Sequence, residues 1–75
     1  MAHTYASAVY IVEATKDGVT EYWIAGTGHD KAAAAVEEQL APGWTATVTS
    51  RRTTPDQVAA LKLRANGVRK LRSLL

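Results

Sequence analysis

The sequence contains no cysteine and no phenylalanine, and only two prolines in 75 residues. Without cysteine, neither a disulfide bond nor a cysteine-ligated zinc ion can stabilise the fold. No hydrophobic run approaches the roughly 20 apolar residues that span a membrane. The first residues also lack the basic and apolar segments of a secretion signal. We therefore expect a cytoplasmic protein with no membrane partner.

The apolar content nevertheless suits a folded domain. Hydrophobic residues make up 47% of the chain, which is ordinary for a globular protein. A chain of 75 residues suffices for one domain and is too short for two. We expect a single domain over residues 1–75, with residues 1–3 and about 68–75 loosely held. Because so short a chain buries a small core, a homodimer would supply further stability.

Charge is unevenly distributed along the chain. The first 50 residues carry two bases and six acids, and the last 25 carry seven bases and one acid. The formal net charge of +2 therefore divides into about −4 and about +6. A basic segment of this kind contacts nucleic acid or an acidic protein surface, or remains solvated and keeps the protein soluble.

Residues 4–26 are predicted to form a β-hairpin. Asp17 and Gly18 tolerate the positive φ angles of a two-residue type I′ turn. The flanking segments are rich in β-branched and aromatic residues, as strands are. With this turn, Val12 pairs with Trp23, and paired residues share a face. One face then carries Val9, Ile11, Tyr22 and Ile24, and the other carries Tyr10, Val12 and Trp23.

A helix and a strand are predicted after the hairpin. Asp30 is a suitable N-cap for a helix over residues 30–41, which Pro42 and Gly43 would end. Residues 44–50 alternate between apolar and polar side chains, which indicates a half-buried strand. Because a helix connects this strand to the second one, we expect these two strands to be parallel, with the first strand between them.

A second helix is predicted to begin at Thr54. Thr54 and Gln57 fit a capping box, Pro55 suits the first helical position, and Asn66-Gly67 is a natural stop. Residues 68–75 would then form a further short helical turn or a loose tail. The expected fold is a two-layer α+β domain, β-β-α-β-α, with a three-stranded sheet of order 2-1-3 and a C-terminal helix.

The hairpin face that carries Tyr10, Val12 and Trp23 has three interpretations. The C-terminal helix covers it, which is the simplest structural explanation. Alternatively, it is a dimer or partner interface, because aromatic patches of this size rarely stay open. In the third interpretation its rings stack on nucleic-acid bases, which requires basic residues on the same face. The hairpin strands carry only Lys16, at the turn, which argues against base stacking.

An anion site is a further hypothesis, at the edge where the two parallel strands end. There the second strand runs into a glycine-containing segment and the first helix, and the third strand runs into two arginines. A helix N-terminus offers N–H groups and partial positive charge to a phosphate or carboxylate. The residues of this hypothetical site are Gly26, Thr27, Gly28, His29, Arg51 and Arg52. The alternative is a tight turn beside solvated arginines.

No pattern in the sequence predicts catalysis, a cofactor or a metal ion. The serines lack a neighbouring base, and no nucleophile-elbow pattern occurs. We therefore expect a non-catalytic module that binds a protein partner through the apolar sheet face and the basic C-terminal segment. Its expected contact residues are Tyr10, Val12, Trp23, Arg51, Arg52, Lys62, Arg64, Arg69, Lys70 and Arg72. The alternative is a nucleic-acid-binding protein that uses the basic region from Arg51 to Arg72.

Overall fold

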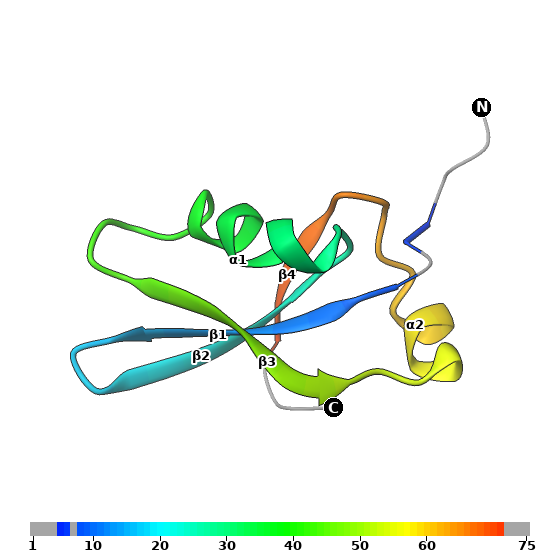
Figure 1. The fold of residues 1–75 in the computed structure, drawn as a ribbon, viewed down its shortest axis with the longest axis horizontal. Coiled ribbons are helices and arrows are strands. Elements are labelled where there is room, and N and C mark those ends of the chain that lie inside the picture. The colour runs from blue at the N-terminus through cyan, green and yellow to red at the C-terminus, as the bar shows by residue number, and fades with distance from the viewer. Residues whose placement is uncertain (1–4, 7, 72–75) are drawn as a thin grey trace.

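The fold, taken from a computed structural model that describes residues 5–6 and 8–71, is an antiparallel sheet with two helices (Figure 1). The elements in this part of the chain are β1 (Tyr10–Lys16), β2 (Val19–Ala25), α1 (His29–Glu37), β3 (Thr45–Arg52), α2 (Pro55–Leu61) and β4 (Val68–Leu71). The order of the strands is β3-β1-β2-β4. The predicted three-stranded sheet of order 2-1-3 is therefore wrong, because a fourth strand extends the sheet beyond β2. Neither helix has the length and apolar character of a membrane span.

The β1–β2 hairpin has the predicted turn and register. Asp17 and Gly18 have φ angles of 50° and 80°, and two positive values are the signature of a type I′ turn. Val12 lies opposite Trp23, as the sequence predicted. β3 pairs with the other side of β1, also antiparallel, so β2 and β3 run parallel to each other. The prediction of two parallel strands on either side of β1 is confirmed.

α1 covers one face of this sheet. The residues buried between α1 and the strands are Val12, Ala25, Ala32 and Val36. Tyr10 and Trp23 pack against this group at its margins. The expectation that the C-terminal helix covers this face is therefore wrong. Ala32 is fully buried, and its small side chain lets α1 lie close to the strands.

The first helix differs from the prediction at both ends. Gly28, rather than Asp30, is the N-cap, and no side chain hydrogen-bonds there; Asp30 lies in the first turn. α1 ends at Glu37 instead of residue 41. The amide N–H groups of Gln39 and Leu40 donate to the carbonyl groups three residues earlier, at Val36 and Glu37. A tighter turn thus follows the helix before the chain enters β3.

α2 and the segment after it pack on the opposite face, near the end of the sheet where β1 begins (Figure 1). The buried residues there are Val9, Ile11, Ile24 and Leu63. The predicted capping box is confirmed: Thr54 Oγ1 accepts a hydrogen bond from the Gln57 N–H, and Gln57 Oε1 accepts one from the Thr54 N–H. However, α2 ends at Leu61, because Lys62 adopts the left-handed conformation with a φ angle of 49°. This early end directs Leu63 into the core.

β4 is the element that the sequence did not predict. Val68 pairs with Ala25 and Leu71 with Tyr22, antiparallel to β2. Val68 packs into the group under α1, and Leu71 packs into the group on the opposite face. The expected helical turn or loose tail is therefore wrong for residues 68–71, and residues 72–75 lie outside the described part of the chain.

Candidate interaction surfaces

The aromatic hairpin face is an internal interface with α1. Val12 is fully buried, so a partner has no access to its side chain. The Tyr10 ring contacts the His29 ring at the start of α1 in an edge-to-face arrangement, with 5.2 Å between the ring centroids. Trp23 is half-buried and packs against the same group. α1 therefore occupies the surface that the sequence analysis assigned to a partner.

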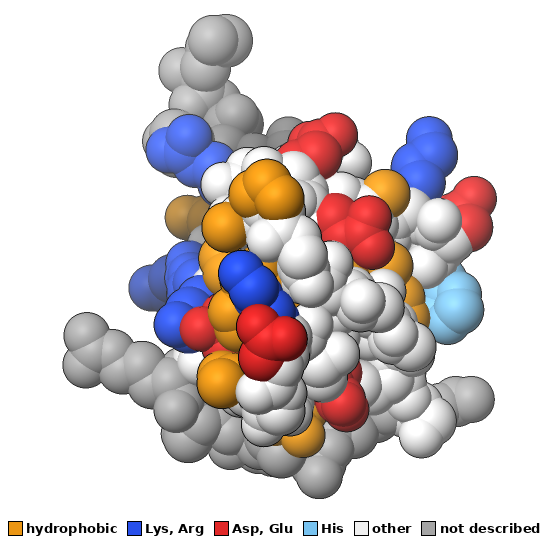
Figure 2. All heavy atoms as spheres, turned by 90° about the vertical axis from the view of Figure 1, so that its left-hand side faces the viewer, with side chains coloured by type: hydrophobic (Ala, Val, Ile, Leu, Met, Phe, Trp, Pro, Cys, Tyr) orange, Lys and Arg blue, Asp and Glu red, His pale blue; other side chains and the backbone are white. Residues whose placement is uncertain are grey.

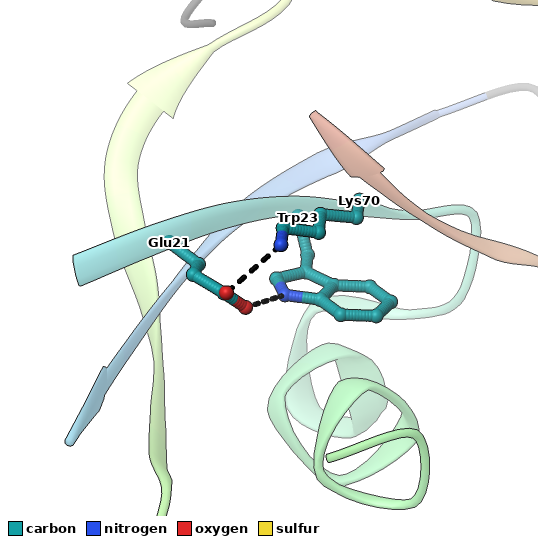
Figure 3. A network of polar contacts seen from close by, with 3 residues as sticks. All are labelled: Glu21, Trp23 and Lys70. Carbon is teal, nitrogen blue, oxygen red and sulfur yellow. Dashed lines mark hydrogen bonds and ion pairs between the residues drawn. The ribbon is translucent and has the colours of Figure 1, made fainter. Parts of the chain in front are cut away.

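Glu21 connects Trp23 to Lys70 (Figure 3). The indole Nε1 of Trp23 donates to Glu21 Oε1 at 3.4 Å, and Lys70 Nζ lies 2.8 Å from Glu21 Oε2. The hydrogen bond from Lys70 is the main reason that the pKa of Glu21 lies below its ordinary value. Lys70, one of the predicted partner contacts, is thus engaged within the protein, where it ties β4 to β2.

Three of the predicted basic contacts surround the connection between α2 and β4. Lys62, Arg64 and Arg69 are all exposed. Arg69 Nη1 donates to the carbonyl group of Leu61 at 3.0 Å, where its charge also complements the C-terminal end of α2. Tyr5, with 53% of its surface exposed, pairs with Arg64 through an isolated β-bridge. No described carboxylate forms an ion pair with these three bases. Arg72 lies outside the described residues.

The predicted anion-site segments meet at one end of the sheet. Tyr10 lies opposite Ala25 on one side and opposite Arg52 on the other, so β2 and β3 end at the same end of the sheet, on either side of β1. The structure describes Arg51 and Arg52 as strand residues and not their side chains. At the start of α1, Asp30 Oδ1 lies 3.0 Å from the position that a Cβ atom on Gly28 would occupy. A carboxylate therefore already lies near the positive end of this helix.

Gly26 has a packing role that the sequence did not indicate. A Cβ atom at this position would lie 2.7 Å from the Ala6 Cβ and 3.1 Å from the Arg64 carbonyl oxygen. The Gly26 N–H donates to the Gly67 carbonyl at 2.8 Å, and the Asn66 N–H donates to the Gly26 carbonyl at 3.0 Å. Gly26 thus allows the chain between α2 and β4 to approach the end of β2 closely.

The edge of β3 is a surface that the sequence analysis missed. β3 has eight residues, and its only charged ones are the last two. It is the outermost strand and has no strand neighbour beyond it within the described residues. Edge strands in natural proteins are usually blunted by lysine, proline, bulges or a covering segment. From Thr45 to Ser50 this strand has neither a charged residue nor a proline. Its register against β1 shifts only between Val48 and Arg52.

The two ends of β3 differ in charge. Its first residues follow the end of α1, where Glu37 and Glu38 are exposed, and its last residues are Arg51 and Arg52. Figure 2 views the molecule from the side of the hairpin tip and of the α1–β3 connection, where acidic side chains lie among Lys and Arg side chains. Two exposed glutamates thus precede the start of the strand in the sequence, and its last two residues are basic.

Comparisons with known proteins give no relative from which a role could be transferred. No family model matches the chain, and no curated protein or solved structure matches it significantly. The surfaces that bear on the function of this chain are therefore the β3 edge and the basic residues around the α2–β4 connection.

Proposed function

We propose that this protein is a small, non-catalytic module that binds an extended segment of a partner protein along the edge of β3. The observation that carries the proposal is the outer edge of β3 from Thr45 to Ser50, which contains neither a charged residue nor a proline. A strand added there forms main-chain hydrogen bonds with this edge, and such bonds supply affinity in β-strand addition. A cytoplasmic location, expected from the sequence, belongs to the same proposal.

The side chains of β3 favour a partner segment with its own alternating pattern. Thr45 and Thr47 are exposed, on the sheet face opposite α1. Ala46 and Val48 are half-buried and pack against the group under α1. A partner strand therefore needs small or apolar residues on the α1 side and polar or β-branched residues on the other side.

The substitution Thr47→Lys tests the proposal. Thr47 lies opposite Glu13 of β1, so the new ammonium group has a carboxylate nearby and the isolated fold is retained. A lysine on an edge strand nevertheless disfavours the addition of another strand. Thr20→Lys is the matched control, because Thr20 is an exposed threonine on the same sheet face, in β2.

Tagged wild-type protein and both variants are used to capture partners from a nuclease-treated cell extract. We expect proteins that the wild type and Thr20→Lys retain, and that Thr47→Lys loses. Hydrogen exchange of the β3 amides should slow in the reconstituted complex, because the added strand protects them. Identical capture by all three proteins, or unchanged exchange in β3, contradicts the proposal.

Nucleic-acid binding is the second candidate, and the basic residues around the α2–β4 connection favour it. Lys62, Arg64 and Arg69 are exposed without a described carboxylate partner, and Tyr5 beside them is exposed. Titration with DNA and RNA oligomers at low salt tests this candidate. Binding should weaken as the salt concentration rises. In Lys62→Gln, the plot of the logarithm of the association constant against the logarithm of the salt concentration should be less steep by about one. Lys31→Gln, in α1, is the control. A flat titration at low salt rules the candidate out.

A further inference from the structure

We infer that the strand added to β3 is the β3 strand of a second copy of this chain, paired antiparallel. This inference rests on the proposed function of the β3 edge and names the partner. The two sheets then form one continuous sheet across the dimer. A two-fold axis normal to the sheet relates the copies. Both α1 helices therefore lie on the same face of the combined sheet.

The residues in the middle of β3 are compatible with their own copies. Pairing about Thr47 places this residue next to the partner's Thr47, and Ala46 next to the partner's Val48. These side chains are small or β-branched, and none carries a charge. Direct opposition of like charges, which destabilises cross-strand pairs, is therefore absent from the centre of the interface.

The charges at the two ends of β3 favour the antiparallel direction. Antiparallel pairing brings the basic end of each strand, Arg51 and Arg52, beside the start of the partner's strand. That start follows the exposed Glu37 and Glu38. The hairpin tip in the same region contributes Lys16 and Asp17, whose charges offset each other. Parallel pairing would instead bring the two basic ends together. Charge complementarity thus selects the arrangement that closes as a symmetric dimer.

The size of the domain gives a reason for the dimer to form. A chain of 75 residues without cysteine has no disulfide to supplement a small core. Apart from Ala14, its described buried residues form two separate groups, one on each face of the sheet. Pairing of the β3 edges turns the outermost described strand of each copy into an inner strand of a larger sheet.

The absence of cysteine from the natural sequence allows a direct test by cross-linking. In the variant Thr47→Cys, the new thiol groups of two copies lie close together at the two-fold axis and form an intermolecular disulfide under mild oxidation. Thr20→Cys is the control, with its thiol exposed elsewhere on the same face. We expect rapid, near-complete cross-linking of Thr47→Cys and slow, concentration-limited cross-linking of Thr20→Cys. Equal rates overturn the inference.

Sedimentation equilibrium of the untagged proteins gives the second readout. The wild type and Thr20→Lys should sediment as dimers. Thr47→Lys should dissociate about fivefold more readily, because two lysines meet near the axis. Circular dichroism verifies that each variant is folded. A wild type that remains monomeric at all soluble concentrations overturns this inference. In that case, loss of captured proteins by Thr47→Lys alone would still support strand addition by a different protein.

Discussion

Trp23 of β2 and Lys70 of β4 are cross-strand neighbours, and both donate a hydrogen bond to the carboxylate of Glu21 (Figure 3). The Lys70 side chain is 54% exposed and that of Glu21 is 22% exposed, so water weakens this ion pair without removing it. The arrangement joins the last strand to the hairpin on the face that α1 covers. It also holds the Trp23 indole in one orientation.

The first prediction concerns the titration of Glu21. Lys70→Met should raise the pKa of Glu21 toward its ordinary value of 4.5, because the main cause of its lowered pKa is removed. A lowered pKa in the folded protein stabilises the fold above pH 4.5, and this contribution is lost as the pH falls through the folded-state pKa. NMR titration of the Glu21 carboxyl carbon measures the shift. The stability difference between wild type and variant should shrink on acidification, and a difference independent of pH would contradict this assignment.

The second prediction compares two glycines that are close in the sequence. Gly26→Ala should destabilise the protein by about 1–3 kcal/mol, because its new methyl group overlaps Ala6 and the Arg64 carbonyl. Gly28→Ala should have a much smaller effect, since its Cβ would meet only the mobile carboxylate of Asp30. Urea unfolding of both variants provides the measurement. Equal destabilisation would show that the close approach at Gly26 is unimportant.

The third prediction concerns the start of α2. Thr54→Ala removes the side-chain oxygen that accepts the Gln57 N–H, and it should cost about 1 kcal/mol of stability. Thr54→Ser keeps this oxygen and should remain near the wild type. Because α2 has only seven residues, hydrogen exchange should also accelerate locally at its amides in Thr54→Ala. If Thr54→Ser loses as much stability as Thr54→Ala, the hydrogen bond is not the cause.

The fourth prediction concerns Leu63, which enters the core directly after α2 ends. Leu63 is 5% exposed and packs with Val9, Ile11 and Ile24. Leu63→Ala should therefore destabilise the protein by about 2–5 kcal/mol, through lost burial and a cavity. Val58→Ala, at a half-buried position of α2, should cost clearly less. Thermal unfolding of the two variants distinguishes a buried core position from a half-buried one at its margin.

The hairpin could be predicted residue by residue because its turn is encoded locally. Only a few dipeptides tolerate two positive φ angles, and Asp17-Gly18 is one of them. Once the turn is placed, the period of two in a strand fixes every pair up to Tyr10 and Ala25. The capping box at Thr54 was equally recognisable, because it depends on two side chains three residues apart.

The end of the chain could not be predicted in the same way. Val68 and Leu71 have the spacing of one helical turn, yet they lie on opposite faces of a strand. Four residues are too few for alternation to be recognised. The strand forms because β2 offers a partner edge, which is tertiary information. Likewise, α2 ends because Lys62 adopts the left-handed conformation. In the sequence, Asn66-Gly67 is a stronger helix stop signal than Lys62, so the helix was expected to continue to that point.

The candidate surfaces were predicted only in part. The exposure of Lys62 and Arg64 agrees with their hydrophilic character, but the engagement of Lys70 with Glu21 depends on the unexpected β4. The aromatic face was assigned to the C-terminal helix or to a partner, because aromatic patches of this size rarely stay open, and the sequence did not indicate that α1 covers it. The alternation of Thr45 to Ser50 was recognised, whereas its position at the edge follows only from the strand order.

The pairing of β4 with β2 has a consequence for the order of events during translation. Tyr22 pairs with Leu71, which the ribosome adds 49 residues later. Until the segment 68–71 leaves the ribosome, β2 keeps one side exposed, although the hairpin and β3 are already outside. The nascent chain thus carries two open strand edges at that stage, one on β3 and one on β2. Emergence of residues 68–71 closes the second edge, so a chain truncated before residue 68 should aggregate more readily than the full chain.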